Sequence, residues 1–157
     1  MLFTKTTLYI DATTTDFGTT TISETLLAAN LNVRTGWQSV HNASGQTYFG
    51  YIKQVMPELL LNVTFEHNSN AVTQKAAWIA ETPKLIRLKV EGAELTTSGT
   101  YTYRTLLIDL AGKWESFDKI GEQNGNDIVT GVFRARYNAT ASKFAVFTLV
   151  NDTDTYD

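Results

Sequence analysis

The segment PELLLNVTFEH, residues 57–67, constrains the fold more than any other part of the sequence. Apolar side chains alternate with mostly polar ones along it, which is the pattern of a β-strand with one buried face. The apolar set is Leu59, Leu61, Val63 and Phe65. A shift of one residue would turn this set toward water, so the alternation also specifies the register of the strand. The chain therefore needs a sheet with a covered face.

Similar patterns predict further strands along most of the chain. They cover residues 5–10, 27–33, 84–95, 101–114, 128–137 and 143–151. The strands at 84–95 and 101–114 are expected to form a pair joined near Ser98 and Gly99.

One helix is predicted around residues 70–81, where Val72, Ala76 and Ile79 recur at helical spacing. Ser69 or Asn70 can cap this helix, and Pro83 stops it. The sequence therefore predicts several strands around one short helix.

Length and composition favour a single domain spanning residues 1–157. There is no cysteine, which excludes disulfides, thiolate metal sites and cysteine nucleophiles. The net charge of −3 indicates no excess of basic residues that would bind a phosphate backbone. Apolar runs are far shorter than the ~20 residues that span a bilayer, and the N-terminus lacks the features of a signal peptide. We expect synthesis in the cytosol and no membrane contact.

Acidic and amide residues cluster at Glu122, Asn124, Asn126 and Asp127, with Asp118 upstream. Loops of this kind can bind calcium, but no Asp opens the cluster and no Glu closes it at the twelfth position. Asn-Gly is a preferred turn dipeptide, because both residues tolerate positive φ. We therefore interpret Asn124, Gly125, Asn126 and Asp127 as a tight turn that sets the register of the next strand.

No catalytic residue is assigned. The two histidines, His41 and His67, lie in no recognised nucleophile motif, and phosphate-cradling glycine loops are absent. Arg134 and Arg136 are two residues apart, so they share a strand face that we expect to be solvated or to form an interface. We predict neither an enzyme nor a bound metal or cofactor.

Aromatic residues are the remaining signal. They could belong to a core, a carbohydrate platform or a protein contact surface, and they include Trp37, Tyr48, Phe49, Tyr51, Trp78, Trp114 and Phe117. Trp78 lies on the predicted helix and is expected in the core. The group between Trp37 and Tyr51 lies on what we predict to be a long loop with too few aliphatic residues to pack on itself. Its aromatic side chains, with His41, are candidates for an inter-subunit interface.

The C-terminal half resembles the major tail protein, or tail tube protein, of long-tailed, siphovirus-type bacteriophages. The resemblance rests on the succession LIRLKVEGAEL, YTYRTLLIDLAGKWESFD, EQNGNDIVTGVFRARYN and FAVFTLVN. It includes a strand that ends in DLAG, a GND turn and a last strand that closes on VN. It covers residues 59–151, including the helix before ETPKLIRLKVEG, and is weak before Gly36.

The resemblance implies a β-sandwich flanked by one helix, and a structural protein of the virion tail made in the host bacterium. Subunits of this family form rings in which neighbouring sheets join, and the rings stack into a tube that passes DNA without sequence-specific binding. The partners implied are further copies of the chain and other tail proteins. Some family members carry two such domains per chain. The rings are therefore expected to be hexamers, or trimers of double domains in which this chain is the C-terminal half.

Two other functions stay open at this stage. A carbohydrate- or receptor-binding β-sandwich module could use Tyr48, Phe49 and Tyr51 as a stacking surface. A metal-dependent hydrolase would need Asp118, Glu122 and Asp127 to converge, which spacing along a β chain cannot show.

Overall fold

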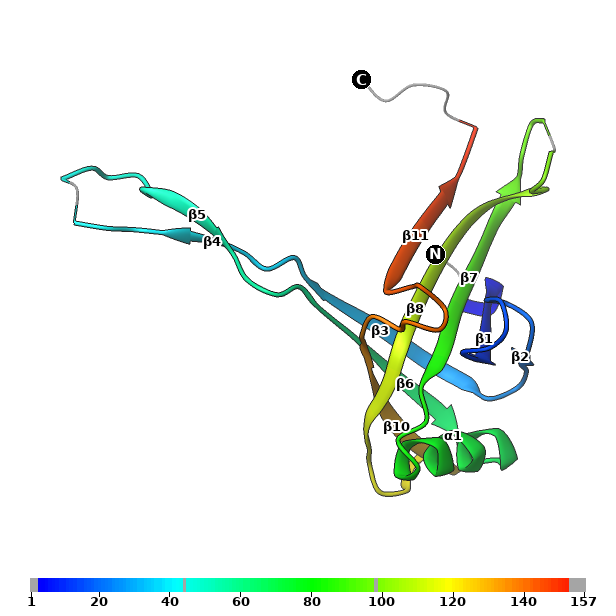
Figure 1. Cartoon of the computed structure of the whole chain (residues 1–157). Coiled ribbons are helices and arrows are strands. Elements are labelled where there is room, and N and C mark those ends of the chain that lie inside the picture. The colour runs from blue at the N-terminus through cyan, green and yellow to red at the C-terminus, as the bar shows by residue number, and fades with distance from the viewer. Residues whose placement is uncertain (1–2, 44, 98, 153–157) are drawn as a thin grey trace.

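The protein is described here from a computed structural model that covers residues 3–43, 45–97 and 99–152. It is mainly β, with a β-sandwich-like body and a two-stranded arm that projects from it (Figure 1). The strands are β1 (Thr6–Ala12), β2 (Thr21–Ile22), β3 (Leu26–Arg34), β4 (Trp37–Val40), β5 (Tyr51–Gln54), β6 (Glu58–Glu66), β7 (Lys84–Glu94), β8 (Tyr103–Phe117), β9 (Gly121–Gln123), β10 (Asn126–Ala135) and β11 (Ala145–Val150). A short 3₁₀ turn, Phe3–Lys5, precedes β1, and the helix α1 spans Ser69–Ile79.

Nine strands form one antiparallel sheet in the order β2-β1-β7-β8-β10-β6-β3, with β11 paired to β8 and β9 paired to β10. The 15-residue strand β8 changes partners along its length. Its first part lies between β7 and β11, and its last part, from Gly112 to Phe117, pairs with β10. The sheet folds over at β8 into two halves that share one core, and this confirms the expected sandwich.

Gly112 lies at the change of partner, opposite Lys84 on β7 and opposite Ala135 on β10. A Cβ atom placed there would lie 2.1 Å from the carbonyl oxygen of Arg134. Real Cβ atoms do not approach a backbone oxygen so closely, so only glycine allows the two strands to meet at this point.

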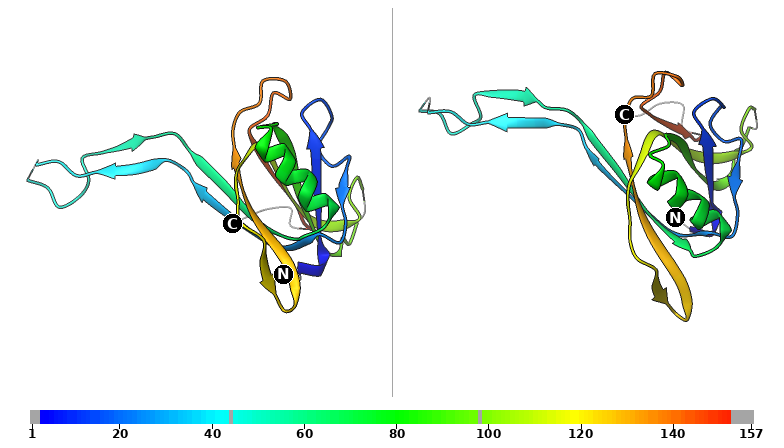
Figure 2. Two further views of the ribbon diagram at one scale, coloured as in Figure 1. Left: turned by 90° about the horizontal axis from the view of Figure 1, so that it is seen from below. Right: turned by 60° about the horizontal axis from the view of Figure 1, so that its bottom comes forward.

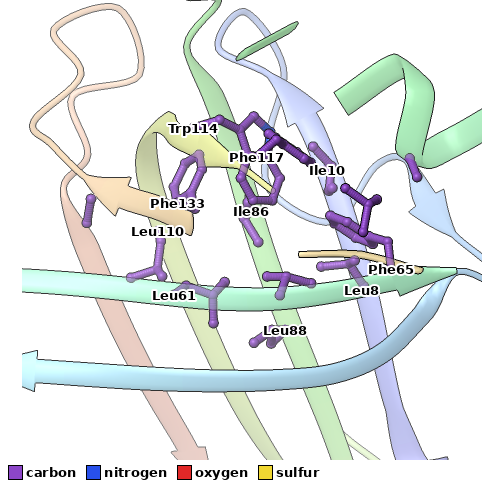
Figure 3. Close-up of a cluster of buried hydrophobic side chains, with 14 of the residues drawn as sticks. Leu8, Ile10, Leu61, Phe65, Ile86, Leu88, Leu110, Trp114, Phe117 and Phe133 are labelled. Carbon is purple, nitrogen blue, oxygen red and sulfur yellow. The ribbon is translucent and has the colours of Figure 1, made fainter. Parts of the chain in front are cut away.

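The core is built from side chains of both halves (Figure 3). Four aromatic rings pack at its centre, with ring centroids 4.9 Å apart for Trp114 and Phe117, 5.3 Å for Trp114 and Phe133, and 5.7 Å for Phe65 and Trp114. Gly131 leaves room for this cluster, because a Cβ atom there would lie 2.9 Å from the Phe117 ring. Each such ring contributes several kcal/mol, about 3 or more, through burial and edge contacts.

A part-buried ion pair between Arg87 on β7 and Asp109 on β8 also holds these two strands together. The guanidinium donates to both carboxylate oxygens, at 2.6 and 2.7 Å, and also to the Phe17 carbonyl at 3.1 Å. The hydrogen bond to Asp109 raises the pKa of Arg87, although partial burial opposes it. Asp11, almost fully buried, accepts hydrogen bonds from the backbone of Gly18 and Thr20, so both carboxylates hold the loop after β1.

The helix exists where the sequence predicts it, but two details of the prediction were wrong. Asn68 is the N-cap, since its side chain accepts from the amides of Asn70 and Ala71, and neither Ser69 nor Asn70 has that role. The helix ends at Ile79, four residues before Pro83, and Glu81 follows with φ of 50°.

The helix α1 buries one of its two sides against the body. The side chains that turn inward are Ala71 and Gln74, with Trp78 half-buried against Phe117 at 5.9 Å. Val72, Ala76 and Ile79 face outward. Gln74 can be buried because its side-chain oxygen accepts a hydrogen bond from the Trp114 indole nitrogen at 3.4 Å. The apolar residues at helical spacing therefore lie on the exposed side, and a polar residue with a buried partner lies on the other side.

The segment predicted as a long aromatic loop is instead largely a β-hairpin, β4 paired with β5. The short strands β2 and β9 were also not predicted, and β10 begins and ends two residues earlier than expected. Gly99 lies in the connection between β7 and β8. Ser98, placed in the same turn by the sequence, lies outside the described residues.

The crossing at Gly112 provides a stability test. We expect Gly112→Ala to lower the free energy of unfolding by about 1–3 kcal/mol, because the added methyl group forces β8 away from β10. Gly99→Ala is the matched control: no atom lies within 4 Å of its would-be Cβ, so its effect should stay within about 0.5 kcal/mol. Urea unfolding followed by circular dichroism measures both, and equal effects would contradict the role given to Gly112.

Candidate assembly surface

The five residues predicted as interface candidates all lie on one projecting hairpin. This hairpin, residues 35–57, is called the arm below; it extends from β3 and β6 well away from the body in every view (Figures 1 and 2). The five are Trp37, His41, Tyr48, Phe49 and Tyr51, and all are exposed. The large side chains among them leave much of their surface in water, for example 60% for Trp37 and 64% for Tyr48.

The arm has two different faces, because residues directly opposite in an antiparallel pair share a face. Trp37 lies opposite Gln54 and shares its face with Ile52, whereas Tyr51 lies opposite Val40 on the other face. Near the tip, the His41 and Phe49 rings meet edge to face with centroids 6.5 Å apart. Neither face is covered by the body. A free two-stranded hairpin is marginally stable in water, so this one is suited to gain order from a partner.

The neck of the arm is narrow. The Val55 amide donates to the Gly36 carbonyl at 2.7 Å, and Gly36 has φ of 79°. A Cβ atom at position 36 would lie 2.1 Å from the Val55 carbonyl oxygen, so the close crossing requires glycine. Two residues, 35 and 36, separate β3 from β4, whereas three, 55–57, separate β5 from β6. This unequal spacing breaks the ladder and separates the arm from the main sheet.

Below the neck, an ion-pair network crosses the outward face of the sheet. Glu58 contacts Arg34 at 3.5 Å and Arg134 at 3.1 Å, and Arg134 also contacts Glu115 at 2.9 Å. The sequence placed Arg134 and Arg136 on one face. Arg134 is bound there to two carboxylates, whereas Arg136, just after β10, is exposed. Exposed pairs of this kind contribute little stability individually, but they balance the charges of Arg34 and Arg134.

The rest of that outward face is small and mostly neutral. It carries the side chains that alternate with the core residues of β3, β6 and β10, including Asn30, Asn62, Thr64, Thr130 and Val132. The hydroxyl groups of Thr64 and Thr130 lie 3.3 Å apart. This surface therefore offers short polar groups and paired charges.

Two apolar surfaces were not identified from the sequence. The strand β11 exposes Val146, Phe147 and Leu149 beside an open groove of about 610 Å³. The outward face of α1 exposes Val72 and Ile79. The helical spacing of Val72, Ala76 and Ile79 was the available signal for the second surface. At β11 the apolar residues run consecutively, so sequence alone does not separate an exposed face from a buried one.

The acidic cluster forms a hairpin end. Asn124 and Gly125, with φ of 54° and 83°, connect β9 to β10, and Asn126 pairs with Gln123. Asn126 and Asp127 belong to β10 rather than to the turn itself. Across the described ranges, no group of three or more histidine and carboxylate side chains could hold a metal ion. The backbone amide of His67 donates to the Asp127 carbonyl at 2.8 Å, which ties this hairpin to the end of β6.

Near the C-terminus, Asp152 accepts hydrogen bonds from Arg104, at 2.8 and 3.1 Å, and from the Thr96 amide at 3.2 Å. The bond to Arg104 is the main cause that lowers the pKa of Asp152. The contact fixes the chain after β11 to the start of β8. In the part of the chain that the structure describes, no helix has the length and apolar character needed to cross a membrane.

Comparisons with known proteins relate this chain to solved structures at the level of the fold. No family model matches the sequence, and no curated protein matches it. A chain of a solved structure described as "Virion of native gene transfer agent (GTA) particle" has a TM-score of 0.57 and 10% sequence identity, over 94% of this chain and 98% of that chain. At this identity the likeness shows a shared fold.

The exposure of the arm gives a direct test of its independence from the core. We expect Trp37→Ala to change the free energy of unfolding by no more than about 0.5 kcal/mol, because this ring packs little against the body. Trp114→Ala, the matched core control at 4% exposure, should cost about 3–5 kcal/mol. Thermal and urea unfolding measure both; a large loss from Trp37→Ala would show that the arm packs on its own molecule.

Proposed function

We propose that this protein is a non-enzymatic structural subunit of a phage-like virion, and more specifically a tail tube subunit. The observation that carries the proposal is the fold likeness to a chain of the gene transfer agent virion along nearly the whole length of both chains. The arm supports it, because a projecting hairpin with exposed aromatic rings needs a partner. The subunit would be made in the host bacterial cytoplasm and act in the virion tail.

The open sheet edges support assembly from many copies. Among the described residues, β3 pairs with β6 alone and β11 pairs with β8 alone, so each leaves one edge for a neighbour. Edges of this length are usually covered. A contact between different edges of successive copies is heterologous, and its repetition around an axis closes a ring. The fold likeness covers 94% of this chain and 98% of the other, and the assemblies that we propose are hexameric rings or trimers of double domains.

The face of β3, β6 and β10 described above suits a channel that passes DNA. Arg34 and Arg134 are paired with Glu58 and Glu115, and among the described residues Arg136, just after β10, is the one arginine of this face without a carboxylate partner. A polyanion binds a surface by releasing counterions from unpaired cations, so a face with few of them holds it weakly and lets it slide. We therefore infer that this face lines the lumen, and that DNA passes it without sequence-specific binding.

Electron microscopy of the purified protein tests the assembly. We expect stacked rings with a central channel to appear as the protein concentration rises. Tyr51→Ala, on the exposed arm, should raise the concentration needed for stacking by about tenfold or more while circular dichroism stays unchanged, because an aromatic anchor at an interface carries 1.4 kcal/mol or more. Monodisperse monomers at high concentration would overturn the proposal.

A carbohydrate- or receptor-binding module is the second candidate, favoured by the exposed rings of Tyr48, Phe49 and Tyr51. A glycan array separates the two functions. A binding module should give a specific signal that Tyr48→Ala removes, since a stacking ring contributes directly to sugar affinity. A tube subunit should give no signal that depends on Tyr48.

A further inference from the structure

The helix α1 exposes an apolar stripe formed by Val72, Ala76 and Ile79. Val72 is 51% exposed and Ile79 is 72% exposed, although both are large apolar side chains. The opposite face of the helix is used by the body, through Ala71, Gln74 and Trp78. Because only one apolar side of this helix packs on the body, the other is available for a partner.

The end of the molecule around this stripe is acidic. Several acidic residues lie close to the helix in the chain or through contacts. Glu66 and Glu81 flank it in sequence, and the Asn68 side chain donates to the Glu24 backbone carbonyl. The His67 backbone amide donates to the Asp127 carbonyl, and Asp118 follows Phe117, which packs on Trp78. With Glu122, which pairs with Asp127, and with Glu115 on β8, there are seven carboxylates in this region. The cations among them are Lys75, Lys113, Lys119, Arg134 and Arg136, and the last two lie beside Ile79 with Lys113. Seven minus five leaves a formal net charge of −2 around the stripe, with Glu81 paired to Lys113 and Glu115 paired to Arg134.

The arm has the opposite character. Residues 35–57 include no Asp or Glu, and their one formal charge is Lys53. The rest of the chain accordingly has 12 basic residues, 13 minus 1, against all 16 acidic ones. The arm therefore combines exposed aromatic rings with a positive charge, which complements an apolar stripe inside an acidic rim.

The arm cannot reach this stripe in its own molecule. It leaves the body from β3 and β6 and points away from α1, as the two views in Figure 2 agree. A complementary pair of surfaces held apart in one molecule can meet only between copies.

We propose that the arm of one copy docks on the Val72, Ala76 and Ile79 stripe of a second copy. This rests on the proposed tube function and names the receiving surface for the arm. The contact is heterologous, so each copy offers an arm and a stripe, and the contacts continue from copy to copy.

The rival receiving surface is the groove beside β11, lined by Val90, Ala93, Leu106 and Leu149 among others. Among its nearby charges, Lys89 is paired with Glu91 and Arg104 with Asp152, and Lys5 also lines the groove. Without an acidic excess it has less attraction for an arm that carries Lys53. This groove serves as the control.

Because the chain has no cysteine, single cysteines can report the contact. Protein with Gln38→Cys on the arm is mixed with size-tagged protein carrying Ala76→Cys in the stripe. The control mixture pairs Gln38→Cys with Leu149→Cys at the groove. All three positions are exposed. After mild oxidation under assembly conditions, denaturing gels and peptide mass spectrometry identify the crosslinked pair.

We expect the 38–76 disulfide to form at least fivefold faster than the 38–149 disulfide. Adding Lys53→Glu to the arm should slow the 38–76 reaction several-fold at low salt, and high salt should reduce that difference. Preferred crosslinking to residue 149, or no dependence on the sign of the charge at 53, would overturn the docking proposal.

Electron microscopy of the same samples separates two kinds of failure. Tubes that form without a 38–76 crosslink would overturn the docking and leave the tube function standing. Samples with neither rings nor crosslinks would overturn both.

Discussion

The close crossing of β8 and β10 at Gly112 is the constraint on which the rest of the structure depends. Because a side chain there would meet the Arg134 carbonyl, only glycine lets β8 leave β7 and continue beside β10. One strand thereby belongs to both halves of the body, and the sheet can fold over on itself. The aromatic cluster of Phe65, Trp114, Phe117 and Phe133 then fills the space between the halves.

Because strands form most of this core, the helix α1 adds only a few contacts to it. It attaches through Ala71, through a hydrogen bond between Gln74 and Trp114, and through the half-buried ring of Trp78. Since those contacts use one side of α1, its apolar residues on the other side stay available to a partner. The same division recurs at β11, where one edge is paired with β8 and exposed apolar side chains lie beside it.

The arm joins the rigid body to the proposed assembly. Its neck at Gly36 and the ion pairs of Glu58 with Arg34 and Arg134 anchor its base, while its aromatic rings remain free of the body. Those same ion pairs balance the charges of Arg34 and Arg134 on the outward sheet face, which we propose lines a channel. A single carboxylate therefore contributes both to the position of the arm and to the charge of the proposed lumen.

The sequence by itself determined the mainly β fold, the strand at 58–66 with its register, the position of the helix, and the residues of the exposed arm. These features depend on local alternation, capping and turn chemistry, which neighbouring residues decide. Tertiary structure decided the rest. The buried face of α1 depended on the hydrogen bond between Gln74 and Trp114. The hairpin in the arm depended on the pairing of β4 with β5, whose sequences show no clear alternation of apolar and polar residues. The ion pairs of Arg134 depended on Glu58 and Glu115, which are distant in sequence. Such contacts join residues far apart in the chain, so no local pattern contains them.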